Sequence, residues 1–390
     1  MKAWHWLIII GVVGLLAAAF LIDQTEFQLG KAQKTKGTSE SASQASITLR
    51  ACDSSQGNYV GPLIPDQAIP NSDSSLSGDK PAEKVPEGAW SKRAGFSIST
   101  PTDPELWAQL LGSGWYLDWG VRTPPIVDNL EYWPMIRVHE DCISPSVEEI
   151  RRVANLYPGQ VWIIGNEPDV IWQDNVTPSK YAIIYHDLYE IINSSDPTAL
   201  IAVGGISQAT PLRLQYLDQV LTTYQNLYHG PMPVDWWTVH GYVLREEKGS
   251  WGVEIPPGID ATQGELREVK DHGRIDLFEA QIRTFRRWME EHGYQHTPLA
   301  LTEFGILMPA SYGFPSEVVT SYLEQTFTWL SEVKDESIGY PEDGYHLVQK
   351  WAWFSISDPI YSTSDLGDLS SGKLTSLGEK FRSMIDAMVP

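Results

Sequence analysis

The chain has 390 residues, 42% of them apolar and 20% charged, which is enough for one large domain with a sizeable core and excludes a small disulfide-stapled fold. Fifty acidic against 28 basic residues give a formal net charge of −22. This charge excludes a nucleic-acid partner, because phosphate binding needs clustered Lys and Arg, and it disfavours anionic polymers as substrates.

The N-terminus resembles an export signal. Lys2 precedes an uncharged apolar run over residues 6–22, and Asp23 begins polar sequence. Residues 1–22 therefore predict either a signal peptide that is removed or a membrane anchor that is retained. Both place the remaining chain outside the cytoplasm, secreted or anchored through residues 6–22, and we expect it to be a monomer.

Residues 23–93 are rich in Ser, Lys, Gly, Asp and Pro, with runs such as SESASQAS, and show no sustained apolar period. We expect a flexible, disordered stalk that links the N-terminal segment to a domain over residues 94–390. Cys52 lies in this linker and Cys142 in the domain. The sequence leaves open whether these two cysteines pair or stay free.

From Gly95 onward, short β-rich apolar runs alternate with segments of helical period, which is typical of βαβ units around a parallel sheet. The predicted fold class is α/β, a (β/α)₈ TIM barrel. The predicted strands are Gly95–Ser99, Trp115–Trp119, Trp133–Val138, Val161–Gly165, Leu200–Gly204, Asp235–His240, Pro298–Thr302 and Val348–Phe354.

Helices are predicted after Thr177-Pro178, before Gly293 and around Leu323, where apolar residues recur on one helical face. After the second strand, VRTPPIVDNLE has two prolines and no helical period, so the second helix is expected to be missing or rudimentary. The stretch from Leu244 to Asp276 is too long for a usual strand-to-helix connection. We expect it to form a lid or cleft wall on the catalytic face.

Two glutamates end predicted strands. Glu167 follows the fourth strand in VWIIGNEPD, and Glu303 follows the seventh in LALTEFG. Either glutamate alone would be read as an ion pair or a loop anchor. Together they lie at the rim from which barrel enzymes take catalytic groups, and they supply the two carboxyl groups that glycoside cleavage requires.

The sequence resembles the large clan of retaining glycosidases, in which an Asn-Glu pair ends strand four and a second Glu ends strand seven. More closely, GSGWYLDWG, EYWPMI, IIGNEPD, VDWWTVHGY, PLALTEFG and WAWFSISD occur in the order seen in glycoside hydrolase family 128, whose characterised members look like endo-β-1,3-glucanases. This resemblance implies that Glu167 is the acid/base, Glu303 the nucleophile, and Asn166 a donor to a sugar hydroxyl. RVHEDC and the long loop before Asp276 depart from the family pattern, and such loops set the glycan preference.

Aromatic residues are frequent at the predicted strands, and at least half of them should pack between strands and helices. We expect Trp119 and Trp353 to face the ligand, since they lie nearest their strand ends. His240 and Tyr242 end strand six, where the clan often places groups that hydrogen-bond the nucleophile or substrate. For His240 the alternative is a satisfied core histidine.

Residues 139–142, His-Glu-Asp-Cys, are all of metal-ligating types. Adjacent side chains in extended backbone point to opposite sides, and no H-x-H or H-E-x-x-H pattern completes a shell, so we expect no metal. No nucleophile elbow, P-loop or dinucleotide fingerprint is present to support acyl, phosphoryl or hydride transfer, and we expect no cofactor.

The sequence therefore predicts a glycoside hydrolase that cleaves β-glycosidic bonds of a polysaccharide or oligosaccharide by retaining double displacement. Two other hypotheses are a non-catalytic carbohydrate-binding barrel at the cell envelope and a metal-dependent hydrolase on the same fold. Fold alone does not decide among them, because barrels host many chemistries.

Overall fold

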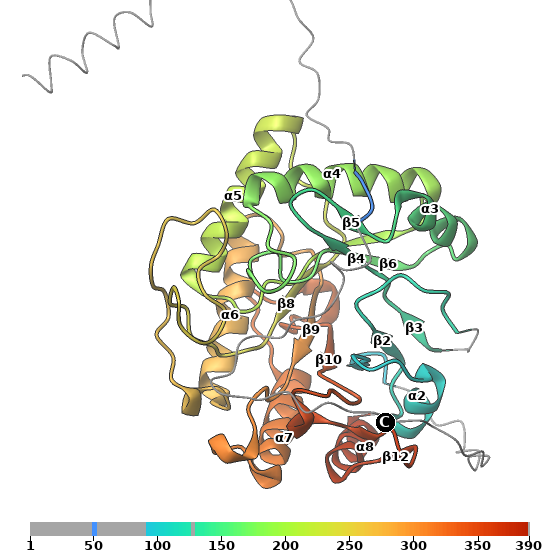
Figure 1. Cartoon of the computed structure of the whole chain (residues 1–390), viewed down its shortest axis with the longest axis vertical. Helices are drawn as coiled ribbons and strands as arrows, with labels where there is room; N and C mark the ends of the chain where they lie inside the picture. The colour runs from blue at the N-terminus through green and yellow to red at the C-terminus, as the bar shows by residue number, and fades with distance from the viewer. Residues whose placement is uncertain (1–48, 53–90, 126–128, 389–390) are drawn as a thin grey trace, which may run out of the picture. The chain divides into compact units, whose positions relative to one another are not determined.

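The computed structural model describes residues 49–52, 91–125 and 129–388, and it shows an α/β fold with a mostly parallel central sheet (Figure 1). All the predicted strand segments contain strands, shifted by a few residues at their ends. The strands are β1 Ala94–Ser97, β2 Trp115–Leu117, β3 Glu131–Tyr132, β4 Met135–Val138, β5 Ile143–Ser144, β6 Val161–Ile164, β7 Leu200–Val203, β8 Trp237–His240, β9 Leu299–Phe304, β10 Lys350–Trp353, β11 Gly367–Asp368 and β12 Lys373–Leu374.

The strands form a six-stranded sheet in the order β3-β2-β1-β10-β9-β8 and a four-stranded sheet in the order β5-β4-β6-β7. Every pairing between the longer strands is parallel, so their carboxyl ends share one edge, here called the carboxyl edge, and their starts form the amino edge. Short antiparallel pairings join β5 to β4 and β11 to β12.

Two features connect the sheets. The predicted third strand is split at Trp133-Pro134: the Trp133 N–H donates to the Tyr116 carbonyl of β2 at 3.1 Å, whereas the Pro134 carbonyl accepts from Ile163 of β6 at 2.9 Å. Pro134 offers β6 only its carbonyl, because proline has no N–H. On the other side, a parallel bridge joins Ala202 of β7 to Trp236, directly before β8.

The helices lie outside the strands (Figure 1). Helix α4 starts at Pro178, because the fixed φ of proline suits the first helical position. The apolar face of α4 packs inward. No helix occurs between β2 and β3 in the part of that segment which the structure describes. The helices are α2 Pro104–Leu111, α3 Val147–Leu156, α4 Pro178–Ser195, α5 Pro211–Tyr228, α6 Ile275–Glu291, α7 Ser316–Glu332 and α8 Ser376–Met388, with short 3₁₀ turns at Val269–Asp271, Ala310–Tyr312, Pro341–Asp343 and Ser362–Ser364.

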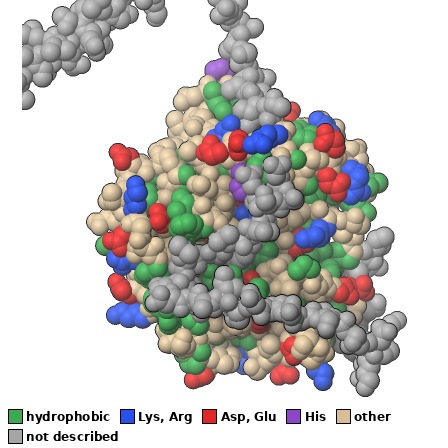
Figure 2. Space-filling model, in the orientation of Figure 1, with side chains coloured by type: hydrophobic (Ala, Val, Ile, Leu, Met, Phe, Trp, Pro, Cys, Tyr) green, Lys and Arg blue, Asp and Glu red, His purple; other side chains and the backbone are tan. Residues whose placement is uncertain are grey.

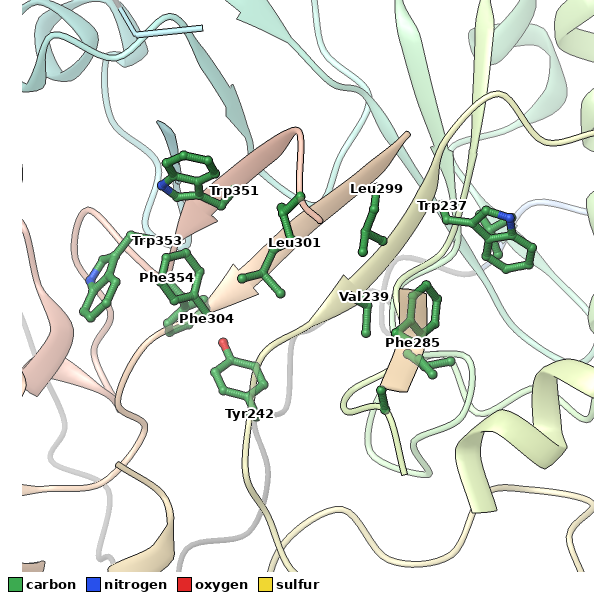
Figure 3. Packing of buried hydrophobic residues seen from close by; sticks show 14 of the residues in the cluster. Trp237, Val239, Tyr242, Phe285, Leu299, Leu301, Phe304, Trp351, Trp353 and Phe354 are labelled. Atoms are coloured by element: carbon green, nitrogen blue, oxygen red, sulfur yellow. The ribbon is translucent and has the colours of Figure 1, made fainter. Parts of the chain in front are cut away.

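Strand alternation divides the core into two layers. The outer layer fills the space between strands and helices, where Trp237 meets Phe285 with ring centroids 6.1 Å apart (Figure 3). A smaller inner cluster lies on the other face of the strands: Trp115, Leu117, Trp133, Met135, Val161, Ile163, Ala202, Ala300 and Ala352.

Residues 49–52, which fall within the predicted linker, are attached to β5 and the residues just before it. Cys52 forms a disulfide with Cys142, and Ala51 bridges Ile143 of β5. Arg50 pairs with Asp141 at 2.6 Å. The predicted anchor over residues 6–22 lies outside the described residues, and among the residues that are described no helix is long and apolar enough to cross a membrane.

Candidate active site

Glu167 is presented by a backbone turn at the end of β6. Gly165 has φ 90°, and Glu167 itself has φ 43°, the left-handed region that costs a non-glycine residue about 1–2 kcal/mol. Its N–H donates to the Gly205 carbonyl, beyond β7, at 2.9 Å. The residue is only 5% exposed, so this strained turn fixes a carboxyl group inside the carboxyl edge.

Glu303 lies in β9 and is 3% exposed. Its pairing partner on β8 is His240, just after an irregularity in the ladder. Two donors reach its carboxylate: the Trp119 indole N–H at 2.6 Å from Oε1, and the Tyr242 hydroxyl at 3.1 Å from Oε2. Both donors favour the ionised form of this carboxyl group.

His240 lies between the two glutamates. Its Nδ1 is 2.9 Å from Glu167 Oε1, and its Nε2 is 3.7 Å from Glu303 Oε1. A side chain at Gly205 would crowd this ring, since a Cβ there would lie 2.8 Å from the His240 Cδ2. The structure thus brings the two predicted catalytic residues together around one imidazole.

Burial raises the pKa of both glutamates, and the neighbouring groups make the rise larger for Glu167. The pKa of Glu167 rises to about 8, first through desolvation and then through the nearby Asp169 carboxylate. The pKa of Glu303 rises to about 7 through desolvation, while His240, Trp119 and Tyr242 oppose the rise. Desolvation also lowers the pKa of His240, which favours a neutral ring. The hydrogen bonds that Trp119 and Tyr242 donate favour the ionised form of Glu303, whereas the Asp169 carboxylate favours the protonated form of Glu167.

Asn166 is buried beside Glu167. Its main-chain N–H donates to Asp174 Oδ2 at 2.7 Å, and its Nδ2 is 3.5 Å from Gln173 Oε1. Its Oδ1 is buried and has no hydrogen-bond partner among the described residues. Arg137 from β4 holds this loop through Asp174 at 2.5 Å and Gln173 at 3.0 Å, which gives the unusual third-strand end a structural role.

Trp353 does not join the other predicted site residues. It is fully buried, its indole N–H donates to the Ser364 carbonyl at 2.9 Å, and it packs against Phe304 (Figure 3). Strand alternation sends it to the helix-facing layer, so we leave it out of the site. The next residue, Phe354, instead meets Trp119 edge-on at 5.6 Å, a contact that sequence reasoning missed.

Each residue of the His-Glu-Asp-Cys run contacts a different partner. Cys142 is in the disulfide, Asp141 binds Arg50, Glu140 accepts the Thr177 N–H at 2.6 Å, and His139 Nδ1 lies 3.1 Å from a carbonyl oxygen. Within the described ranges, no group of three or more His, Cys, Asp or Glu is placed to hold a metal ion.

Charge is dispersed over the surface in view, where acidic and basic side chains of the described residues are interspersed (Figure 2). The net charge of −22 therefore does not gather there into one field that would select a charged polymer.

Solved structures resemble this fold, although no protein-family model matches the sequence and no curated protein matches it. One is a family 128 (subgroup II) endo-β-1,3-glucanase from Sorangium cellulosum, with TM-score 0.52 and 16% identity over 75% of this chain and 98% of that one. A subgroup II endo-β-1,3-glucanase from Pseudomonas viridiflava has a TM-score of 0.51 and 18% identity, over 75% of this chain and 97% of that one. A subgroup I endo-β-1,3-glucanase from Amycolatopsis mediterranei, in complex with laminaritriose, has a TM-score of 0.51 and 15% identity, over 75% of this chain and 100% of that one. The resemblance predicted from sequence is confirmed at the level of fold.

Proposed function

We propose that this chain is a glycoside hydrolase that cleaves β-glycosidic bonds with retention of configuration, using Glu167 as acid/base and Glu303 as nucleophile. The observation that carries the proposal is the pair of buried carboxyl groups on either side of His240, of which Glu167 has the higher pKa and Glu303 has two hydrogen-bond donors. Glycoside hydrolysis requires this division between one proton donor and one ionised carboxylate.

In the first step, the Glu303 carboxylate attacks the anomeric carbon while protonated Glu167 gives its proton to the departing glycosidic oxygen. A glycosyl ester forms on Glu303 and the C–O bond to the leaving sugar breaks. In the second step, ionised Glu167 takes a proton from water, whose oxygen attacks the same carbon and releases Glu303 as carboxylate. Two displacements at one carbon restore its configuration.

Trp119 and Tyr242 support this role of Glu303, since each donates to one of its two carboxylate oxygens and together they fix the orientation of the carboxylate. His240 would stabilise protonated Glu167 when its Nδ1 accepts, and ionised Glu167 when its Nδ1 donates. The resemblance implies that Asn166 donates to a sugar hydroxyl; its amide oxygen, buried beside Glu167 without a partner among the described residues, would accept from one instead.

We infer a neutral β-glucan as substrate, with β-1,3-glucan as the first choice. The structural neighbours named above are endo-β-1,3-glucanases, and the site contains aromatic side chains and neutral donors rather than clustered cations. The long Leu244–Asp276 segment follows β8, at the same edge as both glutamates, and would form part of the cleft that selects the glycan.

We further infer that the strands close a (β/α)₈ barrel. The two sheets are linked on both sides, which supports closure. On one side the segment at Trp133-Pro134 bonds to β2 and to β6, and on the other a parallel bridge joins Ala202 of β7 to Trp236 before β8. We also propose an extracytoplasmic location, which the Cys52–Cys142 disulfide supports because such bonds persist in oxidising compartments.

The test is hydrolysis of a panel of linear β-1,3-, β-1,4- and β-1,6-glucans by the purified protein, followed by NMR of the first-formed anomer. We expect release of reducing ends from β-1,3-glucan with the β-anomer appearing first. No cleavage of any β-linked glycan by folded protein would reject the proposed function, and a first-formed α-anomer would reject the retaining mechanism.

A further inference from the structure

Arg213 is fully buried near the start of α5, between the loop that follows β6 and the loop that follows β8. Its Nη1 donates to the Asp169 carbonyl at 2.8 Å and to the Asp169 carboxylate. Its Nε donates to Glu246 Oε1 at 2.8 Å, and its Nη2 donates to the carbonyls of Val253 at 3.1 Å and Glu254 at 2.9 Å. One guanidinium group thus binds two separate loops of the carboxyl edge.

The two carboxylates around Arg213 have no exposed side-chain surface. Asp169 also accepts from the Ser207 hydroxyl at 3.1 Å, and Glu246 accepts from the Thr210 hydroxyl at 2.6 Å and the Glu265 N–H at 3.0 Å. Buried charges of this kind persist only when partners satisfy them, and removing one partner leaves the others uncompensated. The arrangement therefore holds its loops in one position.

Glu246 links the start of the long loop to its residues 264–265. Beyond its contact with Arg213, its carbonyl accepts the Gly264 N–H at 2.8 Å, and Glu247 forms an antiparallel bridge with Gln263. A Cβ at Gly264 would lie 2.4 Å from Glu246 Oε2, so only glycine allows this approach. The loop is a wall fixed to α5 through Arg213, which argues against a freely swinging lid.

Asp169 connects the same arginine to the proposed acid/base. It lies two residues after Glu167, and the intervening turn is closed by the Val170 N–H donating to the Glu167 carbonyl at 3.0 Å. We propose that Arg213 is a positioning residue that sets Glu167 and the cleft wall relative to each other, so that proton donation and glycan binding depend on one buried side chain. This inference rests on the proposed function.

The charged and titratable groups around Glu167 come from several elements. They are Asp169 and Asp174 on its own loop, Arg137 on β4, Arg213 on α5, His240 on β8, Glu303 on β9 and Tyr361 after β10. Weakening the contact of Arg213 should raise the pKa of Glu167, because that positive charge lowers it.

Arg286 supplies a matched control. It is an equally buried arginine on α6, but it donates to the main-chain carbonyls of Ile338, Thr297 and Gln295 at 2.9, 3.0 and 3.1 Å. We compare Arg213→Lys with Arg286→Lys, since both keep a positive charge and lose the planar fork.

For Arg213→Lys we expect kcat on β-1,3-glucan to fall about 10- to 100-fold. The alkaline limb of the pH–rate profile should move to higher pH, because an ammonium group without the planar fork cannot bind Asp169 and Glu246 together and so compensates the Asp169 carboxylate beside Glu167 less well. Arg286→Lys should keep kcat within about twofold and leave that limb in place, even if both variants unfold at lower temperature. Equal losses in the two variants, with neither pH profile changed, would show that Arg213 is only a structural residue.

Limited trypsin digestion gives a readout that does not depend on activity. The wall carries cleavable sites at Arg245, Lys248, Arg267 and Lys270. Mass spectrometry should find cuts at these sites much earlier in folded Arg213→Lys than in the wild type or Arg286→Lys. Unchanged resistance of the wall in Arg213→Lys would overturn the proposal whatever the wild-type protein hydrolyses.

If Arg213→Lys does not fold, Glu246→Gln is the second variant. Its amide would place a donor against the Glu265 N–H, so the wall should loosen, and KM for long glucan chains should rise about tenfold while kcat for a small aryl glycoside stays within about twofold. Unchanged KM and unchanged trypsin resistance would reject the inference. A wild-type protein without hydrolase activity but with the expected digestion pattern would instead reject the proposed function alone.

Discussion

The two edges of the sheet combine charges in opposite ways. At the amino edge, Lys350 meets an opposite charge: its Nζ donates to Glu131 at 2.7 Å and lies 5.4 Å from the centre of the Trp115 ring. At the carboxyl edge, Glu167 and Glu303 are like-charged when ionised and share one imidazole. The first arrangement stabilises the fold, whereas the second raises the free energy of the ionised site.

Buried polar atoms without a hydrogen-bond partner among the described residues occur at both edges, such as Gln160 Oε1 and Trp237 Nε1 at the amino edge, but those at the carboxyl edge adjoin the proposed catalytic residues. His240 Nε2, Asn166 Oδ1 and Thr302 Oγ1 are buried at the carboxyl edge without a hydrogen-bond partner among the described residues. The left-handed backbone of Trp119 and Glu167 adds strain there. Such costs persist where function requires them, so the comparison predicts that substitutions at the carboxyl edge change chemistry and those at the amino edge change stability.

The largest effect should come from replacing one glutamate at each edge by glutamine. Glu303→Gln removes the nucleophile and should lower kcat on β-1,3-glucan on the order of 10⁴-fold. Glu131→Gln, at the start of β3, should leave kcat within about twofold. Initial rates measure the loss of kcat in each variant, and thermal melts measure the loss of stability. Comparable losses of kcat in both variants would contradict the distinction between the edges.

Glu167→Ala should lower kcat on unactivated glucan by about 10²–10⁴-fold, because the leaving oxygen then lacks its proton donor. An aryl glycoside whose leaving group needs no proton should still form the glycosyl ester, and added azide should raise its turnover. Equal loss on both substrate types, without azide rescue, would remove Glu167 from the role of acid/base.

Two tryptophans sharpen the comparison between layers. Trp119→Phe removes a donor from Glu303 and should lower kcat about 10-fold or more. Trp353→Phe loses the bond to the Ser364 carbonyl in the helix-facing layer, and should cost about 1–2 kcal/mol of unfolding free energy with kcat unchanged. Rates and denaturant melts test this, and a larger kcat loss in Trp353→Phe would return that residue to the site.

A smaller effect concerns pH and stability. The pKa of Glu167 rises from 4.5 to about 8 on folding, so its contribution to stability is full below its unfolded pKa and is lost as pH rises through about 8. Glu167→Gln cannot ionise, so its melting temperature relative to the wild type should increase between pH 5 and pH 8 by roughly 2 °C or more. A difference that stays constant or shrinks with pH would show that Glu167 is not held neutral by burial.

Much of the fold could be predicted from the sequence because each strand carries its own apolar run. The split at Trp133-Pro134 could not, since it depends on which neighbour each half pairs with. The position of Trp353 was missed because alternation gives two possible faces and sequence does not fix which one is inward. Its neighbour Ala352 belongs to the inner cluster, which sends Trp353 outward.

The site was predicted through strand ends, and this signal located Glu167, Glu303, His240, Tyr242 and Trp119 together. Arg213 was missed because it lies on a helix, far from any strand end. A signal was present, since Arg213 occupies the same buried stripe of α5 as Tyr216, Leu217, Val220 and Tyr224. A charged residue on an apolar stripe requires buried partners, but sequence cannot name them.

Covalent trapping tests the central claim most directly. A 2-deoxy-2-fluoro laminaribioside with a good leaving group slows breakdown of the glycosyl ester, so the intermediate accumulates. Mass spectrometry of peptic peptides should place one label on Glu303, and Glu303→Gln should take up none. A label on Glu167 or another carboxylate would contradict the assignment of Glu303 as the nucleophile.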